Sequence, residues 1–114
     1  MNLKNLEESM IFDNNKLTKI IVFNDKDVLG FVLNLKQGHT LPFHKHENSA
    51  LTLLVLQGSC DLQVDKEVKK IQKGSVVLAK GDEEFGIPKV HEDLSIFVTL
   101  TPNPTDPKFS QEIR

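Results

Sequence analysis

Short apolar stretches alternate with turn residues along most of this chain, and that rhythm most limits its possible folds. Between residues 16 and 101 the turn residues recur about every eight to ten positions. No stretch has the apolar repeat of a long helix, whereas residues 60–64 alternate apolar and polar side chains as a half-buried strand does. The sequence therefore predicts an all-β fold, a sandwich or a barrel, rather than an alternating α/β design.

The expected organisation is a single domain, because 114 residues are few for two separate cores. We divide the chain into a polar N-terminal segment of residues 1–15, a barrel of residues 16–101 and a proline-rich tail of residues 102–114 that wraps the surface or frays. One short amphipathic turn in the N-terminal segment is expected to lean on the barrel. Strands are expected over residues 19–23, 28–35, 39–46, 51–57, 60–64, 68–71, 75–79, 85–87 and 94–100.

Charge and composition narrow the class of partner and the compartment. The net charge of −2 gives no general attraction to nucleic acids or anionic membranes, so we expect neither as a partner. The longest apolar stretch, residues 51–56, is too short to cross a bilayer. The first ten residues lack the apolar core of a signal peptide, and the single cysteine, Cys60, excludes an internal disulfide. These features predict a cytoplasmic protein.

Two histidines one residue apart, His44 and His46, form the most informative motif. On an extended strand their side chains point to the same face, with Cα atoms about 7 Å apart. At that spacing both imidazoles can reach one metal ion at about 2.0–2.2 Å, while Lys45 points away. Pairs of this kind also occur as half-buried, hydrogen-bonded histidines, and the motif alone leaves both interpretations open.

The surroundings of the histidine pair resemble two sequence motifs of the cupin superfamily. Gly38, then His44 and His46 after five intervening residues, then Gly58 after an apolar strand resemble the first motif. Residues 74–79, the loop 80–82 and Phe85 resemble the second. The resemblance covers roughly residues 28–101 and implies a cupin-type double-stranded β-helix, or jelly-roll barrel. It also implies the family's usual divalent metal, held by three histidines and one glutamate.

This chain departs from the family pattern at two of those four metal ligands. Leu51 stands at the position of the family's glutamate and Phe85 at that of its third histidine, while Lys80 replaces a proline. We expect Leu51 and Phe85 to pack on each other inside the barrel and to turn a metal pocket into dry core. Apolar walls raise the cost of burying an incompletely coordinated ion. His44 and His46 are thus an incomplete metal site, and a divalent metal (Zn, Ni, Mn or Fe) is expected to be weakly held or absent.

The remaining candidate residues have plain structural interpretations. Cys60 is expected inside the barrel as a small hydrophobic residue. His39, Glu83 and His91 are expected in exposed loops. Phe43 either lines the mouth of the barrel or packs on the outer face at a dimer contact, and the sequence leaves the two open.

Three functions remain. The first is a barrel that binds a small, partly apolar molecule, with the two imidazoles orienting the ligand. It is preferred because positions 51 and 85 have both become apolar. The second is a metal-dependent cupin enzyme, of isomerase or dioxygenase type, that uses His44, His46 and a supplementary ligand. The third is a structural or regulatory protein, since small cupins commonly form homodimers. The expected ligand pocket comprises His44, His46, Leu51, Leu53, Val55, Cys60, Leu62 and Phe85.

Overall fold

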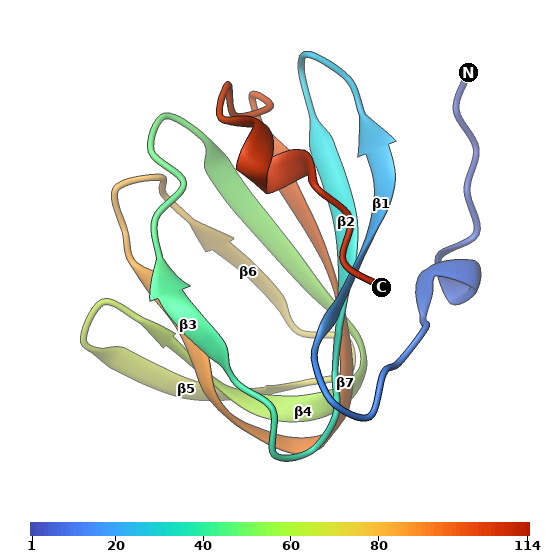
Figure 1. Cartoon of the computed structure of the whole chain (residues 1–114). Coiled ribbons are helices and arrows are strands. Elements are labelled where there is room, and N and C mark those ends of the chain that lie inside the picture. Colours follow the sequence, from blue (N-terminus) through green and yellow to red (C-terminus); the bar gives the residue numbers. More distant parts are fainter.

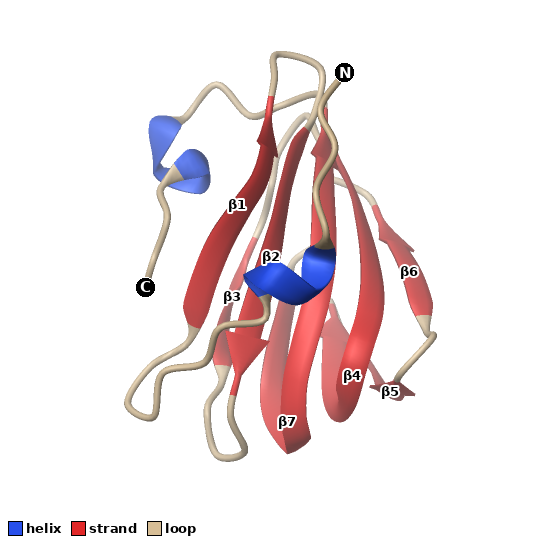
Figure 2. Ribbon diagram, turned by 90° about the vertical axis from the view of Figure 1, so that its right-hand side faces the viewer, coloured by secondary structure: helices blue, strands red, loops and turns tan.

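A computed structural model describes all 114 residues and shows an all-β protein, as the alternation predicts. Every strand pair is antiparallel, and the chain contains two short 3₁₀ helices but no α-helix (Figures 1 and 2). No helix is long and apolar enough to cross a membrane. The elements in chain order are η1 Leu6–Ser9, β1 Thr18–Asn24, β2 Leu29–Leu35, β3 Leu41–His44, β4 Ala50–Val64, β5 Glu67–Gln72, β6 Val76–Ala79, β7 Phe85–Thr101 and η2 Pro107–Ser110.

Strands β4 and β7 are long, pair with each other and pass through both layers of the barrel. The first half of β4 and the second half of β7 lie with β1, β2 and β6. The second half of β4 and the first half of β7 lie with β3 and β5. The predicted strand breaks at residues 58–59 and 88–93 are therefore wrong, because both strands continue through bulges in their register instead of ending.

Gly58 lies at the bend of β4, where the two long strands come into close contact. Its φ of +82° belongs to the left-handed region that favours glycine. A Cβ atom at this position would stand 2.1 Å from the backbone oxygen of Asp93 on β7. The glycine therefore lets both strands bend together and bring the two layers face to face.

The space between the layers is filled by one apolar cluster. Alternate residues of β2, β4 and β7 supply most of it, as the period of two in a strand requires. All the apolar residues of the predicted pocket belong to this cluster, and each is at most 5% exposed. The cluster comprises Leu29, Phe31, Leu33, Leu35, Leu51, Leu53, Val55, Cys60, Leu62, Ile71, Ala79, Phe85, Ile87, Val90, Leu94, Ile96, Val98 and Leu100.

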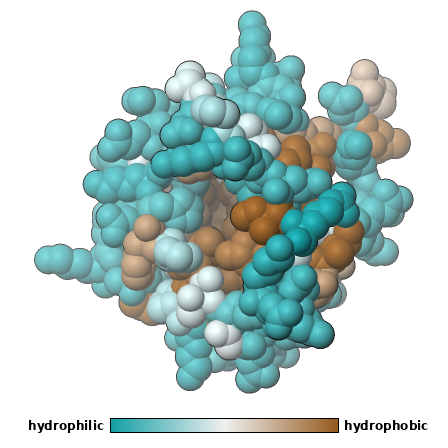
Figure 3. Space-filling model, viewed as in Figure 1, coloured by the Kyte–Doolittle hydropathy of each residue, from teal (hydrophilic) through white to brown (hydrophobic).

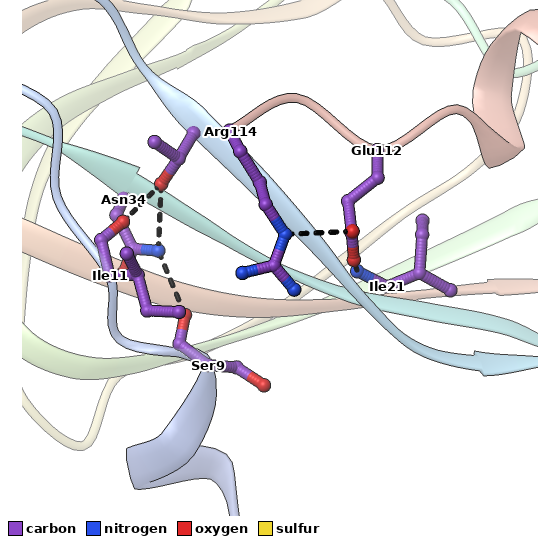
Figure 4. Close-up of polar contacts among 7 residues, drawn as sticks. Ser9, Ile11, Ile21, Asn34, Glu112 and Arg114 are labelled. Carbon is purple, nitrogen blue, oxygen red and sulfur yellow. Dashed lines mark hydrogen bonds and ion pairs between the residues drawn. The ribbon is translucent and has the colours of Figure 1, made fainter.

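A buried row of polar side chains fastens the N-terminal segment to the outer face of the barrel. Thr18, Asn34 and Ser95 lie side by side on β1, β2 and β7. The Asn34 amide donates to the Ser9 carbonyl oxygen at 2.9 Å and to Thr18 Oγ1 at 3.0 Å, and Thr18 donates to the Ile11 carbonyl (Figure 4). Ser95 Oγ donates to Asn34 Oδ1 at 2.6 Å. The segment thus leans on the barrel as predicted, held by side-chain hydrogen bonds to the carbonyl oxygens of Ser9 and Ile11.

Residues 102–114, which we call the C-terminal strap, fold back across the open face of the barrel (Figure 1). Ile113 pairs with Lys19 on the edge strand β1, with backbone N···O distances of 2.7 and 2.9 Å. The Ile21 amide donates to Glu112 Oε1 at 2.9 Å, and Arg114 pairs with the same carboxylate (Figure 4). Nearer the start of the strap, Asn103 bonds to Asn24. The tail therefore wraps the surface and covers the β1 edge.

We predict that Gly58→Ala destabilises the fold much more than Gly74→Ala. Both glycines have positive φ, but a Cβ at Gly74 would have nothing within 4 Å. Gly74→Ala should therefore cost about 1–2 kcal/mol for conformational strain alone. Gly58→Ala adds the collision with Asp93 and should cost at least about 2 kcal/mol more, or prevent folding. Urea unfolding of both variants measures the difference, and equal losses would contradict the role given to the bend.

Candidate functional site

His44 and His46 converge on the interior, although the strand that carries them ends between them. β3 ends at His44, and the chain then turns so that the Ser49 amide donates to the His46 carbonyl oxygen at 3.0 Å. The two rings nevertheless meet edge to face, with centroids 4.6 Å apart. The predicted convergence is present, but the turn after β3 produces it rather than strict alternation along a strand.

Gly81 holds the turn that positions His46. A Cβ atom at Gly81 would lie 2.5 Å from the His46 carbonyl oxygen and 2.7 Å from the Ser49 carbonyl oxygen. Only glycine lets the loop between β6 and β7 pack so closely on this backbone. A loop of the second cupin-like motif therefore determines where the second histidine of the first motif lies.

Aromatic side chains enclose the imidazoles on two sides. Phe85, opposite His44 in the β3–β7 pair, has its ring centroid 4.6 Å from that of His44 and 5.3 Å from that of His46. Phe109 of the C-terminal strap lies on the other side of His46, at 4.9 Å between centroids. His46 is only 4% exposed, and His44 is half-buried. Phe85 thus packs on the two imidazoles, at the position where the family has a metal-binding histidine.

Lys19 belongs to the same site and was not predicted from the sequence. This lysine is 8% exposed, its ammonium lies 4.4 Å from the centroid of the Phe31 ring, and it donates to the carbonyl oxygen of Phe109. The alternation of side chains along β1 indicates that Lys19 points inward, since Leu17 and Ile21, which pack against the core, lie two residues away on either side. A lysine between two inward-facing apolar positions of a strand is a signal of a buried cation.

All the charges that act on the imidazoles are positive. Burial, together with His44, Lys19 and Lys108, lowers the pKa of His46 to about 3. Burial also lowers the pKa of His44, an effect that the Pro42 carbonyl partly offsets, and burial lowers the pKa of the Lys19 ammonium. The imidazoles are therefore neutral near pH 7. His44 Nδ1 lies 2.8 Å from the Pro42 carbonyl oxygen, which only accepts, so its Nε2 is left as an acceptor.

The ring nitrogens of His46 have no hydrogen-bond partner within the protein, although the ring is buried. No fully enclosed side-chain nitrogen or oxygen of the molecule lacks a partner. The nitrogens of His46 therefore reach accessible space at the mouth rather than closed core. In the space-filling view the open face is hollowed at its centre, with apolar side chains inside and polar ones around the rim (Figure 3).

The other predicted candidates lie away from the histidine pair or are chemically quiet. Cys60 is fully buried, and burial raises the pKa of its thiol to about 12, so the thiol stays protonated and unreactive. Phe43 is 44% exposed and leans on Gly86, which settles its place on the outer face. His39 and Glu83 are bound to neighbouring loop backbone. The loop placement of His91 is wrong, because it lies within β7 and contacts Asp61 at 2.8 Å.

Two hollows of the surface lie away from the histidines. One of about 510 Å³ opens between β5 and β6 and is lined by Leu62, Val64, Ile71 and Val77 among others. Another, of about 1260 Å³, lies between the N-terminal segment and β4 near Leu56. Neither includes the histidines or Lys19. We place the candidate site at the histidines, because the chemically capable side chains converge there and Phe109 packs on them.

Comparison with known proteins identifies the fold. A protein of Thermus thermophilus, TT1209, is 24% identical, with a TM-score of 0.84 over 91% of this chain and 100% of its own. An RmlC-like cupin protein of Desulfovibrio desulfuricans is 26% identical, with a TM-score of 0.80 over 90% and 97%. A Klebsiella pneumoniae protein with a double-stranded β-helix domain is 17% identical, with a TM-score of 0.84 over 93% and 94%. This chain has the cupin fold. No family model and no curated protein matches its sequence.

The donor set of this protein does not fit the divalent metal that the fold implies. The protein contains no group of three His, Cys, Asp or Glu side chains placed to hold an ion. Leu51 and Phe85 occupy two ligand positions of the family pattern, and both are buried in the apolar cluster. Lys19 also turns a positive charge toward the imidazoles, which opposes a cation.

Replacing Phe85 with histidine should create a metal site. The new imidazole would join two that already lie near it, which gives three nitrogen ligands. We expect Phe85→His to bind Co²⁺ or Zn²⁺ at least about tenfold more tightly than the natural protein, with a rise in melting temperature when metal is added. Phe43→His, on the outer face, is the matched control. Titration calorimetry measures both, and equal metal binding by the two variants would contradict the geometry.

The buried His46 should make the fold sensitive to acid. Its pKa is about 3 in the folded protein against 6.5 for an ordinary histidine, so between these pH values only the unfolded chain binds the proton. The free energy of unfolding should therefore fall as the pH drops below 6.5, by at most about 1.4 kcal/mol per unit from this residue. Urea unfolding at pH 7 and pH 5 measures the fall. The fall in unfolding free energy should be smaller in His46→Leu but unchanged in His39→Leu. An unchanged fall in His46→Leu would disprove the assignment of the acid sensitivity to His46.

Proposed function

We propose that this cupin binds a small, partly apolar molecule at the mouth of its barrel, with His44 and His46 as the groups that orient it. The observation that carries the proposal is the state of the His46 ring. It is buried and neutral, it lies between two phenyl rings, and its nitrogens have no partner in the protein. A neutral imidazole in apolar surroundings offers one hydrogen-bond donor and one acceptor, and these can fix the orientation of a bound molecule.

The surroundings favour a flat or apolar ligand body. The rings of Phe85 and Phe109 pack on the imidazoles in tilted orientations, at centroid distances of 4.6–5.3 Å. Aromatic groups pack at such separations, and a ligand ring would gain the same contacts. A few polar groups on an apolar wall are the usual composition of a small-molecule site. The metal-dependent enzyme receives less support, because the donor set lacks a third ligand. The homodimer and the cytoplasmic location stay predictions.

A neutral probe tests the proposed function. Benzyl alcohol has one ring and one hydroxyl group, and it should shift the backbone NMR signals of residues around His44, His46 and Phe85. Loss of one hydrogen bond in His46→Leu should weaken its binding about fivefold, and His44→Leu should act in the same direction.

The matched control for this titration is His91→Leu, which removes an imidazole outside the site. His91 contacts Asp61 on the neighbouring strand and belongs to neither aromatic wall. Its variant should bind benzyl alcohol as the natural protein does. Signal changes confined to the hollow between β5 and β6, or an equal loss of affinity in all three variants, would contradict the proposed site.

A further inference from the structure

One residue of the C-terminal strap occupies the candidate site with two of its groups at once. The carbonyl oxygen of Phe109 accepts a hydrogen bond from the Lys19 ammonium, and the phenyl ring of the same residue packs on His46 at 4.9 Å. Between these two groups lie only the Cα and Cβ atoms of the residue. Phe109 therefore presents to the barrel the skeleton of a 3-phenylpropanoyl group, with its carbonyl on a cation and its ring on an imidazole.

The Lys19 ammonium lacks a full negative partner in this arrangement. It donates a hydrogen bond to a neutral carbonyl oxygen and makes a cation–π contact with the face of Phe31. The Asp and Glu side chains of the strap are engaged elsewhere, since Asp106 pairs with Lys108 at 3.7 Å and Glu112 pairs with Arg114 at 3.0 Å. A buried ammonium held by neutral groups is less well stabilised than one held by a carboxylate, which forms a charge-assisted bond.

We propose that the ligand of this site is a small aryl-substituted carboxylate, which binds Lys19 in place of the Phe109 carbonyl and places its ring against His46 in place of the Phe109 ring. This inference rests on the proposed function and adds the chemical class of the ligand. It also makes the strap a tethered competitor, because strap and ligand need the same two contacts. The ligand gains a full charge at Lys19 that the peptide carbonyl does not have.

The site also determines the size and charge of such a ligand. One carboxylate suffices, because Lys19 is the only ammonium buried among the aromatic rings, while Lys108 is 67% exposed on the strap. The ring must lie about two carbon atoms from the carboxylate, as the geometry of Phe109 shows. A phosphate would bring two charges to a single buried cation and is therefore less well matched.

The experiment compares 3-phenylpropanoate with its neutral amide, 3-phenylpropanamide, by calorimetry on the full-length protein at pH 7. The natural protein should bind the carboxylate at least about tenfold more tightly than the amide. Lys19→Met should remove that preference, because it weakens the binding of the carboxylate more than that of the amide. Lys70→Met, which removes an exposed lysine of β5, is the matched control and should keep the preference.

The competition with the strap has its own measurement. Phe109→Ala removes the ring of the competitor and should tighten the binding of both probes about three- to tenfold. In the natural protein, added 3-phenylpropanoate should speed hydrogen exchange at the amide of Phe109. Weaker binding to Phe109→Ala, or slower exchange on ligand addition, would show that the strap closes over a ligand and would overturn the competition.

The outcomes separate this inference from the proposed function. If the amide binds at His46 as tightly as the carboxylate, the site remains a small-molecule site but the carboxylate assignment fails. If neither probe nor benzyl alcohol binds, the carboxylate assignment and the proposed function both fail. Inorganic phosphate that binds more tightly than 3-phenylpropanoate would also overturn the assignment. The comparison of the two probes on the natural protein decides the ligand class even where Lys19→Met does not fold.

Discussion

The pairing of β4 with β7 is the constraint on which the rest of the molecule depends. These two strands are the only ones that run through both layers, and every other strand except β1 pairs directly with one of them. Their common bend at Gly58 places the two apolar faces opposite each other, and the interior cluster then forms from alternate residues. The same bend brings Phe85, at the start of β7, into the layer that carries β3, and so opposite His44.

The chemistry of the mouth follows from an imbalance of charge in a place with little water. Two imidazoles and one ammonium lie near each other, and the fields that reach His46 come from other basic groups. The protein accommodates this by keeping the imidazoles neutral and by giving the ammonium a carbonyl and an aromatic face. Such an arrangement is complementary to the negative charge and apolar surface of the proposed ligand.

The sequence predicts the interior better than it predicts the site. Period-two alternation placed Leu51, Leu53 and Val55 inside the barrel, and the resemblance to cupin motifs supplied the fold. The continuity of β4 and β7 was missed because Gly58 and the register bulges interrupt the alternation that marks a strand. Lys19 was missed because a lysine on an edge strand is normally exposed, although its parity with Leu17 and Ile21 indicates an inward side chain.

The C-terminal strap is a second part of the chain whose contacts the sequence does not predict. A proline-rich stretch with scattered charges has no periodicity, so nothing in its pattern indicates which residue packs on the barrel. In the structure β1 determines where the strap lies, because its free edge pairs with the backbone of Ile113. The register of that pairing places the Phe109 carbonyl over the ammonium of the same Lys19 whose backbone holds Ile113.

Lys19 therefore takes part in two features that are usually separate, the covered edge of a sheet and the proposed binding site. The strap is fixed near its ends, by Asn103 at the β1–β2 turn and by Ile113 on β1. The segment between them, which includes η2, contacts the site through Phe109 and Lys108. A ligand that takes the side chain of Lys19 need not break the backbone pairing of the same residue. The edge can thus stay covered while the mouth opens, so the cost of opening is limited to the contacts of a few residues rather than to the fold.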